Sequence, residues 1–426
     1  MPSNQPPVDI SALKKATQGT DYLSFDNAYV NKNAYLIEKW ASIIESPNAP
    51  KIKGDRDKAV LANLLENAYA EAKNINSSSI LKTKAYESEL NASVAASAKI
   101  PVLLGLIRQV FPRLISGEIC STQPLDRPTG KVFRLKMNRD DGSDTGDINT
   151  SPWSNYVSYA NNSAEAANII PGTSPAFNPV LATQGHGMQL SITGDDVSVG
   201  VPKKLLLDAS FELEQDLMAY TGLSAGDELL IAGKDEIARE IDGDIINTIR
   251  NAAIASYNIT WGLNNPGGYT YTEYKQTLAT AILHGAANIF QYRNAEPNWI
   301  ICGTNAALHL QDLSSYRVPM FDDNQSSQFT SAMNVFGSVE NSYVIYKSRY
   351  LPVNEMIIGR KGASFLDSGA FFLPYILLYI TAKFQDPYTQ KWAQSLQSRY
   401  TTYITYNNWF SRINIDPNAS GPGYTG

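Results

Sequence analysis

The sequence predicts an α+β protein with long extensions, and three observations carry that prediction. Isoleucine recurs every four residues from Ile237 to Ile249, within a helix-favouring run of about 28 residues, which indicates one long helix. Alternating apolar and polar residues at 131–136 and again near the C-terminus indicate strands. About fifty residues, 138–187, follow neither period, which indicates a loop that projects from the body.

Length and charge limit the classes of function. The chain has 426 residues, enough for two or three ordinary domains or for one large body with extensions. Its formal charge is −6, and residues 1–100 hold 12 basic and 11 acidic side chains, so no segment is polybasic. We therefore expect no sequence-specific binding of nucleic acid. Cys120 and Cys302 lack metal-ligand spacing, which fits folding in a reducing cytoplasm.

Neither export nor membrane insertion is expected. Residues 1–20 lack the charged start and apolar core of a signal peptide. The longest apolar run, 371–380, is about half the length of a membrane-spanning helix and contains Pro374. The sequence therefore predicts no membrane partner.

The pattern of residues 1–98, short helical pieces between polar breaks, predicts an N-terminal arm. One helix within it has an apolar stripe, which we expect to dock on something else instead of forming a core of its own. The stripe consists of Val60, Leu61, Leu64, Leu65 and Tyr69.

Residues 99–130 predict a buried helix followed by a rigid corner. Apolar pairs recur every four residues up to Ile115, and Pro112 is expected to kink the helix. In the corner, two prolines fix their own backbone angles and Gly130 is expected to allow a turn. The corner residues are Gln123, Pro124, Pro128, Thr129 and Gly130. A strand is expected directly after it, and a second from 188 onward.

Past Pro202 the pattern predicts helix, first over 205–220 and then, after a break at 221–228, along the isoleucine ladder. The ladder residues are Ile237, Ile241, Ile245 and Ile249. Gly233 and Gly243 would weaken this helix slightly, so we expect close packing at both.

The run 264–268, Asn-Asn-Pro-Gly-Gly, is predicted to mark a domain boundary. After it, the sequence predicts buried strands at 296–303 and 342–348 and a short helix at 305–313. A polar loop is expected at 321–337. Residues 374–408 read as long strands rich in Tyr and Thr.

Catalytic chemistry is not indicated. The three histidines, His186, His284 and His309, have no neighbouring nucleophile or metal ligand in the sequence. The acidic run 140–147 has Gly142 where a calcium loop needs an oxygen ligand, so a solvated loop is favoured. We expect no catalytic residue, cofactor or metal site, and no enzyme activity.

Three segments carry a specific resemblance. The first matches at Ile119, Cys120, Gln123, Pro124, Pro128, Thr129, Gly130 and Phe133. The second matches at Glu212, Asp216, Leu217, Ala219, Gly222, Leu223, Ala225, Glu228, Leu229, Glu236, Ile237, Glu240, Ile241 and Ile249. The third matches at Gly359, Lys361, Gly362, Asp367, Gly369, Phe371, Phe372, Pro374, Tyr375, Arg399 and Tyr400. Together they resemble the major capsid proteins of T-even-type tailed phages, which have the HK97 fold.

That resemblance implies an HK97-like capsid fold with an N-terminal arm, an E-loop, a P-domain with a long spine helix, and an A-domain. The implied segments are the arm (1–98), the first P-domain helix and corner (99–130), the E-loop (131–200), the P-domain spine helix (201–262), the A-domain (263–372), the P-domain closing strands (373–411) and a C-terminal tail (412–426). The closing-strand motif is Pro374, Tyr375, Arg399 and Tyr400. The resemblance also implies that the E-loop lies over an adjacent subunit.

The implied function is a shell protein that self-assembles into hexamers and pentamers around double-stranded DNA, bound without sequence specificity. Its implied partners are other copies of itself and portal, scaffolding and minor or decoration proteins, in a virion assembled in the host cytoplasm. The resemblance implies that family members are often trimmed after a Glu that follows an apolar residue two positions earlier. Glu45 and Glu66 of this chain fit that pattern, but we expect residues 1–98 to remain attached. Two alternatives stay open: a cellular nanocompartment shell of the same fold, and a cytoplasmic α+β enzyme.

Overall fold

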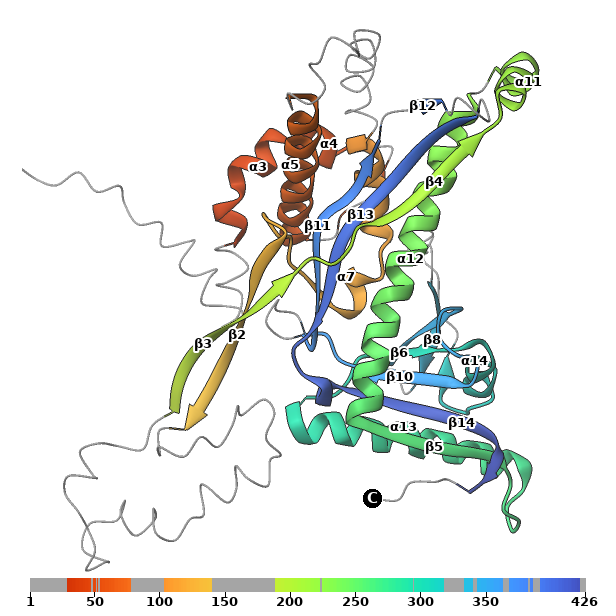
Figure 1. The fold of residues 1–426 in the computed structure, drawn as a ribbon. Coiled ribbons are helices and arrows are strands. Elements are labelled where there is room, and N and C mark those ends of the chain that lie inside the picture. The colour runs from red at the N-terminus through yellow and green to blue at the C-terminus, as the bar shows by residue number, and fades with distance from the viewer. Residues whose placement is uncertain are drawn as a thin grey trace, which may run out of the picture.

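The structure is a computed structural model with a long helix beside two sheets and a projecting ribbon (Figure 1). It describes residues 29–46, 49–50, 52, 54–77, 103–139, 188–222, 224–293, 295–317, 333–339, 343–362, 368–381, 384–385 and 391–421. The predicted projecting loop, the acidic run 140–147 and His186 lie outside the described residues.

The predicted long helix is α12, Ala225–Ser256, which spans 32 residues. All four ladder isoleucines are buried, with at most 2% of each side chain exposed. Close packing at the two glycines is confirmed: a Cβ on Gly233 would lie 2.7 Å from Leu396 Cδ1, and one on Gly243 would lie 3.0 Å from Tyr350 Cδ1. The helix passes directly into a strand at Tyr257.

The first sheet lies beside α12 and has five strands. Its order is β1 (Ser121–Thr122), β11 (Ala370–Ile380), β13 (Trp392–Ile404) and β12 (Phe384–Gln385), with β4 (Lys203–Ala209) also paired to β13. The predicted helix over 205–220 is wrong at its start, because Leu205–Leu207 form part of β4. Helix α11, Phe211–Thr221, begins only after Ser210 and ends at Gly222, whose φ is 72°.

The second sheet has seven strands. Its order is β5 (Tyr257–Asn264), β14 (Phe410–Ser420), β10 (Glu355–Gly359), β6 (Trp299–Cys302), β9 (Tyr343–Ser348), β8 (Met333–Val339) and β7 (Tyr316–Arg317). Helices α13 (Tyr271–Arg293) and α14 (Thr304–Gln311) accompany it. The predicted strands at 296–303 and 342–348 and the short helix between them at 305–313 are confirmed as β6, β9 and α14.

Three boundaries differ from the sequence analysis. Residues 412–420, predicted as a tail, lie in β14, which pairs with both β5 and β10 because Ile413 and Ile415 alternate into the core. The sheet begins at β5, ahead of the predicted boundary at 264–268. Residues 333–337, predicted as loop, belong to β8.

The ribbon consists of β2 (Thr129–Arg139) and β3 (Met188–Ser198), paired antiparallel from Thr129↔Ser198 to Arg139↔Met188. It forms a separate two-stranded sheet that projects away from both larger sheets (Figure 1). The sequence analysis predicted both strands.

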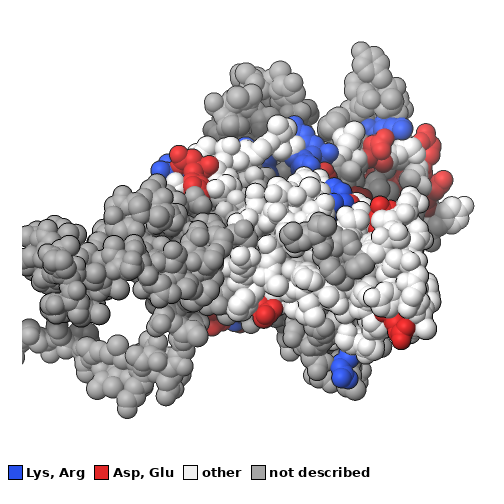
Figure 2. Space-filling model, turned by 90° about the horizontal axis from the view of Figure 1, so that it is seen from below, with Lys and Arg blue, Asp and Glu red and all other residues white. Residues whose placement is uncertain are grey.

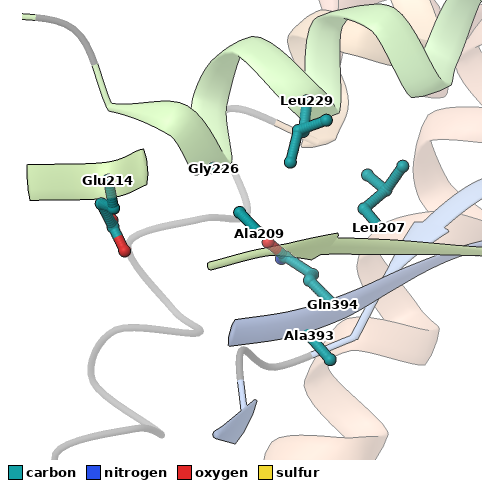
Figure 3. A pocket seen from close by; sticks show the side chains of 7 residues that line it. All are labelled: Leu207, Ala209, Glu214, Gly226, Leu229, Ala393 and Gln394. Atoms are coloured by element: carbon teal, nitrogen blue, oxygen red, sulfur yellow. The ribbon is translucent and has the colours of Figure 1, made fainter. Parts of the chain in front are cut away.

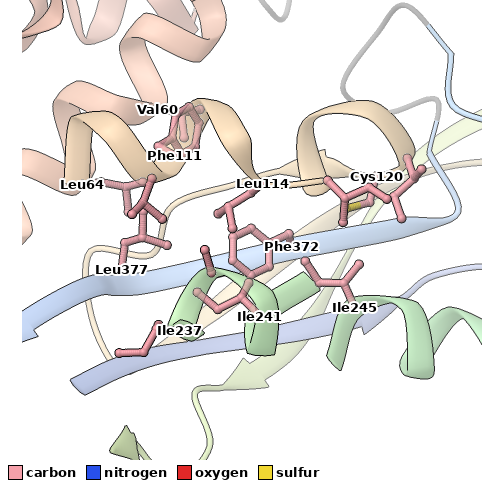
Figure 4. Packing of buried hydrophobic residues seen from close by; sticks show 14 of the residues in the cluster. Val60, Leu64, Phe111, Leu114, Cys120, Ile237, Ile241, Ile245, Phe372 and Leu377 are labelled. Atoms are coloured by element: carbon pink, nitrogen blue, oxygen red, sulfur yellow. The ribbon is translucent and has the colours of Figure 1, made fainter. Parts of the chain in front are cut away.

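The described part of the arm contains α3 (Ala34–Lys39), α4 (Ala41–Ile44) and α5 (Asp55–Ser77). The predicted stripe does dock, and its acceptor is the main core of the same chain. Val60, Leu61, Leu64 and Leu65 are fully buried in a cluster that also contains the α12 ladder and residues of β11 (Figure 4). The helix over 103–110 in the same cluster does not kink at Pro112; it gives way to a 3-10 turn, Phe111–Arg113, followed by α7, Ser116–Ile119.

Candidate assembly site at the root of the ribbon

The corner before the ribbon is fixed along β11 by backbone hydrogen bonds. Ser121 and Thr122 pair in parallel with Phe371 and Phe372. The Gln123 N–H then donates to the Phe372 carbonyl at 2.9 Å, and the Leu125 N–H donates to the Pro374 carbonyl at 3.0 Å. The direction in which the chain leaves the body is therefore set by one strand of the first sheet.

Gly130 serves close packing, not a turn. It lies in β2, and its φ is outside the left-handed region that glycines occupy at Gly222 or Gly267. A Cβ there would come within 2.6 Å of Leu125 Cδ2. Leu125 belongs to a small core with Val132, Val197, Phe371 and Leu373, which joins the root of the ribbon to β11.

Two more corner residues extend the pairing of the ribbon. The Pro128 carbonyl accepts from the Val199 N–H at 2.8 Å, one step beyond the pair Thr129↔Ser198. Gln123 Nε2 donates to the Lys131 carbonyl at 3.2 Å, which ties the corner back to β2. Pro124 lies between the two residues that bond to β11.

The closing-strand motif lies directly beside this corner. Pro374 pairs with Tyr400 and Ile376 with Arg399, so the register skips Tyr375 at a bulge. A bulge tolerates a proline inside a sheet because no ladder N–H is needed there. The Arg399 guanidinium lies over the Tyr375 ring, 5.5 Å from its centroid. The structure thus brings the predicted corner and the predicted closing motif together.

Asn67 of α5 connects the corner to the closing-strand motif, and the sequence analysis missed this residue. Its Nδ2 donates to the Leu125 carbonyl at 2.8 Å and to the Tyr375 carbonyl at 3.1 Å. The bulge leaves the Tyr375 carbonyl available for this bond. A polar residue on a helix gives no sequence signal for such a role, since its partners lie 58 and 308 residues away.

Tyr400 links the closing motif to the long helix. Its hydroxyl donates to Asp244 Oδ2 at 2.6 Å, and Lys203 Nζ of β4 lies 2.8 Å from the same oxygen. Burial, followed by this hydrogen bond, raises the pKa of Tyr400. Asp244 lies on the same helix as the ladder isoleucines, so this helix is joined to both β13 and β4.

A buried carboxyl group on α12 was also missed. Asp242 is fully buried, and its Oδ1 accepts from the Ile115 N–H at 2.9 Å. Burial raises the pKa of Asp242 to about 8. The carboxyl group therefore holds its proton at neutral pH while it joins the long helix to the segment before the corner.

A cluster of two arginines around one glutamate joins α12 to the second sheet. Arg250 donates to Glu355 through Nε at 2.6 Å and through the guanidinium NH2 at 2.8 Å, and Arg412 also bonds to this carboxylate. Burial alone would raise the pKa of Glu355, but the bonds from both arginines outweigh it and lower the pKa to about 2. The helix is thus connected to both sheets by specific polar contacts.

Features of an enzyme site are sparse in the described part of the chain. Burial, then the nearby Lys275, lowers the pKa of His309, and no group of three metal-ligating side chains occurs among the described residues. A cavity between α11, α12 and the first sheet encloses about 10 Å³, room for roughly one water (Figure 3). Of the helices described, none is both long and apolar enough to cross a bilayer.

The arrangement is that of a structural subunit: an arm helix, a corner, closing strands and a long helix that together hold a projecting ribbon. Comparison of sequences gives the class. The profile of the family described as major capsid protein Gp23 matches residues 96–187 and 176–420. The chain therefore belongs to the major capsid protein Gp23 family, and it is a shell protein of a tailed phage, located in the virion capsid.

Individual relatives agree with this family. The major capsid protein of Salmonella phage ViI is 24% identical over 315 residues, covering 65% of this chain and 71% of the relative. The major capsid protein of Enterobacteria phage T4 is 21% identical over 478 aligned positions, covering 87% of this chain and 91% of the relative. With the order of elements described above, the predicted HK97-like α+β fold is confirmed.

Solved structures with partial similarity include two shells. The capsid of Myoviridae phage XM1 aligns with a TM-score of 0.41 and 9% identity, over 70% of this chain and 90% of that one. The SrpI encapsulin complex from Synechococcus elongatus PCC 7942 aligns with a TM-score of 0.42 and 8% identity, over 75% of this chain and 92% of that one.

Proposed function

We propose that copies of this chain assemble into hexamers and pentamers that close a head shell around double-stranded DNA. One observation carries the proposal. The ribbon β2–β3 is a separate two-stranded sheet, anchored at its root and projecting beyond the body. Isolated two-stranded ribbons are marginally stable in water, so this one is expected to lie on another subunit.

Many modest contacts of this kind suit a shell. Each copy touches several neighbours, so weak contacts sum to a stable particle while single contacts stay reversible during assembly. We assign the ribbon and the loop beyond it to the E-loop, α12 with the first sheet to the P-domain, and the second sheet with α13 and α14 to the A-domain. None of these roles requires a catalytic group.

The packaged DNA would be held without sequence-specific contacts. The formal charge of −6 gives no strong basic field, and the face in Figure 2 is largely free of charged side chains where residues are described. Portal, scaffolding and minor or decoration proteins are the expected further partners, with assembly in the host cytoplasm.

The arm is proposed to stay attached. Asn67 of α5 holds the ribbon root, and the preceding Glu66 bonds to Lys39 Nζ at 2.7 Å and Trp40 Nε1 at 3.0 Å. Intact mass measurement of virion protein tests this. A mature chain starting near Asn67 would contradict it.

Electron microscopy tests the assembly itself. We would express the protein alone and together with its neighbouring reading frames, and examine both preparations. Hexameric rings, lattices or closed shells are expected. Well-behaved monomers or dimers in both preparations would contradict a self-assembling shell, and shells that enclose a cargo enzyme instead of DNA would favour the nanocompartment alternative.

A further inference from the structure

Asp242 of α12 lies in apolar surroundings that disfavour a carboxylate. Its side chain is fully buried, and its neighbours Ile241 and Ile245 belong to the main core. Oδ1 accepts one hydrogen bond, from the Ile115 N–H at 2.9 Å, and Oδ2 is buried without a partner among the described residues. Buried polar atoms nearly always have a partner, so this oxygen calls for an explanation. One donor for two oxygens fits a protonated acid better than a carboxylate.

The ionisable groups around Asp242 keep one charge state from about pH 5 to pH 8. Cys120 behind α7, Tyr350 before β10 and Tyr400 of β13 face it. Burial raises the pKa of all three, that of Cys120 to about 12, so they stay neutral. Among the described residues, no lysine or arginine bonds to the Asp242 carboxyl group. Asp242 is therefore the group that can change charge in this part of the core.

Asp242 holds the middle of the 109–120 segment, which leads into the corner. At the start of the segment, Gln109 Oε1 accepts from the buried Lys234 Nζ of α12 at 2.6 Å. Directly after its end, β1 pairs with β11. Between these two fixed ends, the bond from the Ile115 N–H to Asp242 joins the segment to the buried side of α12. Breaking this bond would free the middle while both ends stay attached.

The other polar contacts of the segment lie outside this buried position. Arg113 is 3.6 Å from Asp235, and both side chains are more than a third exposed, so the pair contributes little. On the side towards the second sheet, Glu118 bonds to Tyr346, and Lys361 bonds to a carbonyl group of α7. None of these groups reaches Asp242 Oδ2.

We propose that Asp242 is a proton-controlled latch between α12 and the 109–120 segment. With its proton, the carboxyl group holds the segment against the helix. When the proton passes to water, the buried charge favours an opened segment in which the carboxylate is hydrated. The proposal goes beyond the shell function and does not depend on it, since it concerns one subunit. It makes the segment before the ribbon sensitive to pH.

The direction of the pH dependence follows from linkage. Burial raises the pKa of Asp242 from 3.8 to about 8 while the segment is closed, and opening returns the group to its ordinary value. Between these two values, opening releases one proton. Each pH unit should therefore raise the opened fraction about tenfold, and the rise should level off above about pH 8.

The two native cysteines supply a probe and a control. Cys120 ends the segment and is fully buried, whereas Cys302 is equally buried in β6 of the second sheet. We would treat the full-length subunit with iodoacetamide and follow each site by mass spectrometry. Because the thiolate reacts, exposure alone makes the rate rise about tenfold per pH unit. With the latch, the rate at Cys120 should rise about 100-fold per unit between about pH 5.5 and 7.5, while Cys302 stays unmodified.

Two variants separate Asp242 from other causes. Asp242→Asn has no proton to lose, so its rate at Cys120 should rise only about tenfold per pH unit. Asp227→Asn, an exposed change on the first turn of α12, is the matched control and should keep the wild-type profile. A wild-type rise of only tenfold per unit would overturn the latch, even if Asp242→Asn did not fold. So would an unchanged profile in Asp242→Asn, or equal modification of Cys302, which would mean that the whole subunit unfolds.

Discussion

Replacing Asn67 by alanine should loosen the root of the ribbon. The side chain donates two hydrogen bonds, to the Leu125 carbonyl at 2.8 Å and the Tyr375 carbonyl at 3.1 Å. Each such bond contributes about 1 kcal/mol. Alanine has a higher helix propensity than asparagine by roughly 0.6 kcal/mol, which partly offsets the loss of the two hydrogen bonds. The free energy of unfolding is therefore expected to fall by about 1.5 kcal/mol.

The assay is chemical denaturation of the unassembled subunit. Asn251→Ala is the matched control, because Asn251 is an exposed residue inside α12 and gains the same helix propensity. The control should be stabilised by roughly 0.6 kcal/mol, so the two variants should differ by about 2 kcal/mol. A difference below about 0.5 kcal/mol would refute the role of Asn67 in holding the corner to the closing strand.

Three further substitutions test other parts of the account. Gly130→Val should reduce shell yield more than subunit stability, since its Cβ would displace Leu125 at the ribbon root; aggregated, unfolded subunits would contradict this. Ile241→Ala should cost about 2–5 kcal/mol in denaturation, because the side chain is fully buried, and a loss below about 1 kcal/mol would argue against the packing described. The stability that protonated Asp242 contributes is fully present below its ordinary pKa of 3.8 and is lost as pH rises towards 8, because only the folded protein keeps the proton. Asp242→Asn keeps an acceptor for the Ile115 N–H and should make the free energy of unfolding depend less on pH over this range. An unchanged pH dependence would refute this role of Asp242.

Features with a local period could be predicted from the sequence. The ladder from Ile237 to Ile249 repeats at helical spacing, so α12 follows from neighbouring residues alone. The arm stripe around Leu64 was predicted to dock for the same reason. Its acceptor could not be predicted, because α5 packs on β11, which is some 300 residues further along the chain.

Features decided by distant partners were mispredicted. Three consecutive leucines, Leu205–Leu207, fit helix and strand equally well, and pairing with β13 nearly 190 residues away decides for strand. Residues 412–420 did carry a signal, the alternation of Ile413 and Ile415. Its place between β5 and β10 became evident only from the sheet order.

The candidate site also contains some features that the sequence predicts and others that depend on distant partners. The corner around Pro128 was predicted from its prolines and glycine, and the closing motif around Pro374 was found through family resemblance. Neither observation tells how the two are joined. Asn67 and Asp242 are polar residues on helices and look like solvent-facing positions in a sequence. Their roles depend on carbonyl and amide groups that only the tertiary fold brings to them.

A cryo-electron microscopy reconstruction of the assembled particle tests the central claim most directly. The account predicts that the β2–β3 ribbon leaves its own subunit at the corner and lies on the surface of an adjacent copy throughout the shell. A ribbon folded back onto its own subunit, or a particle in which another protein forms the shell, would contradict it.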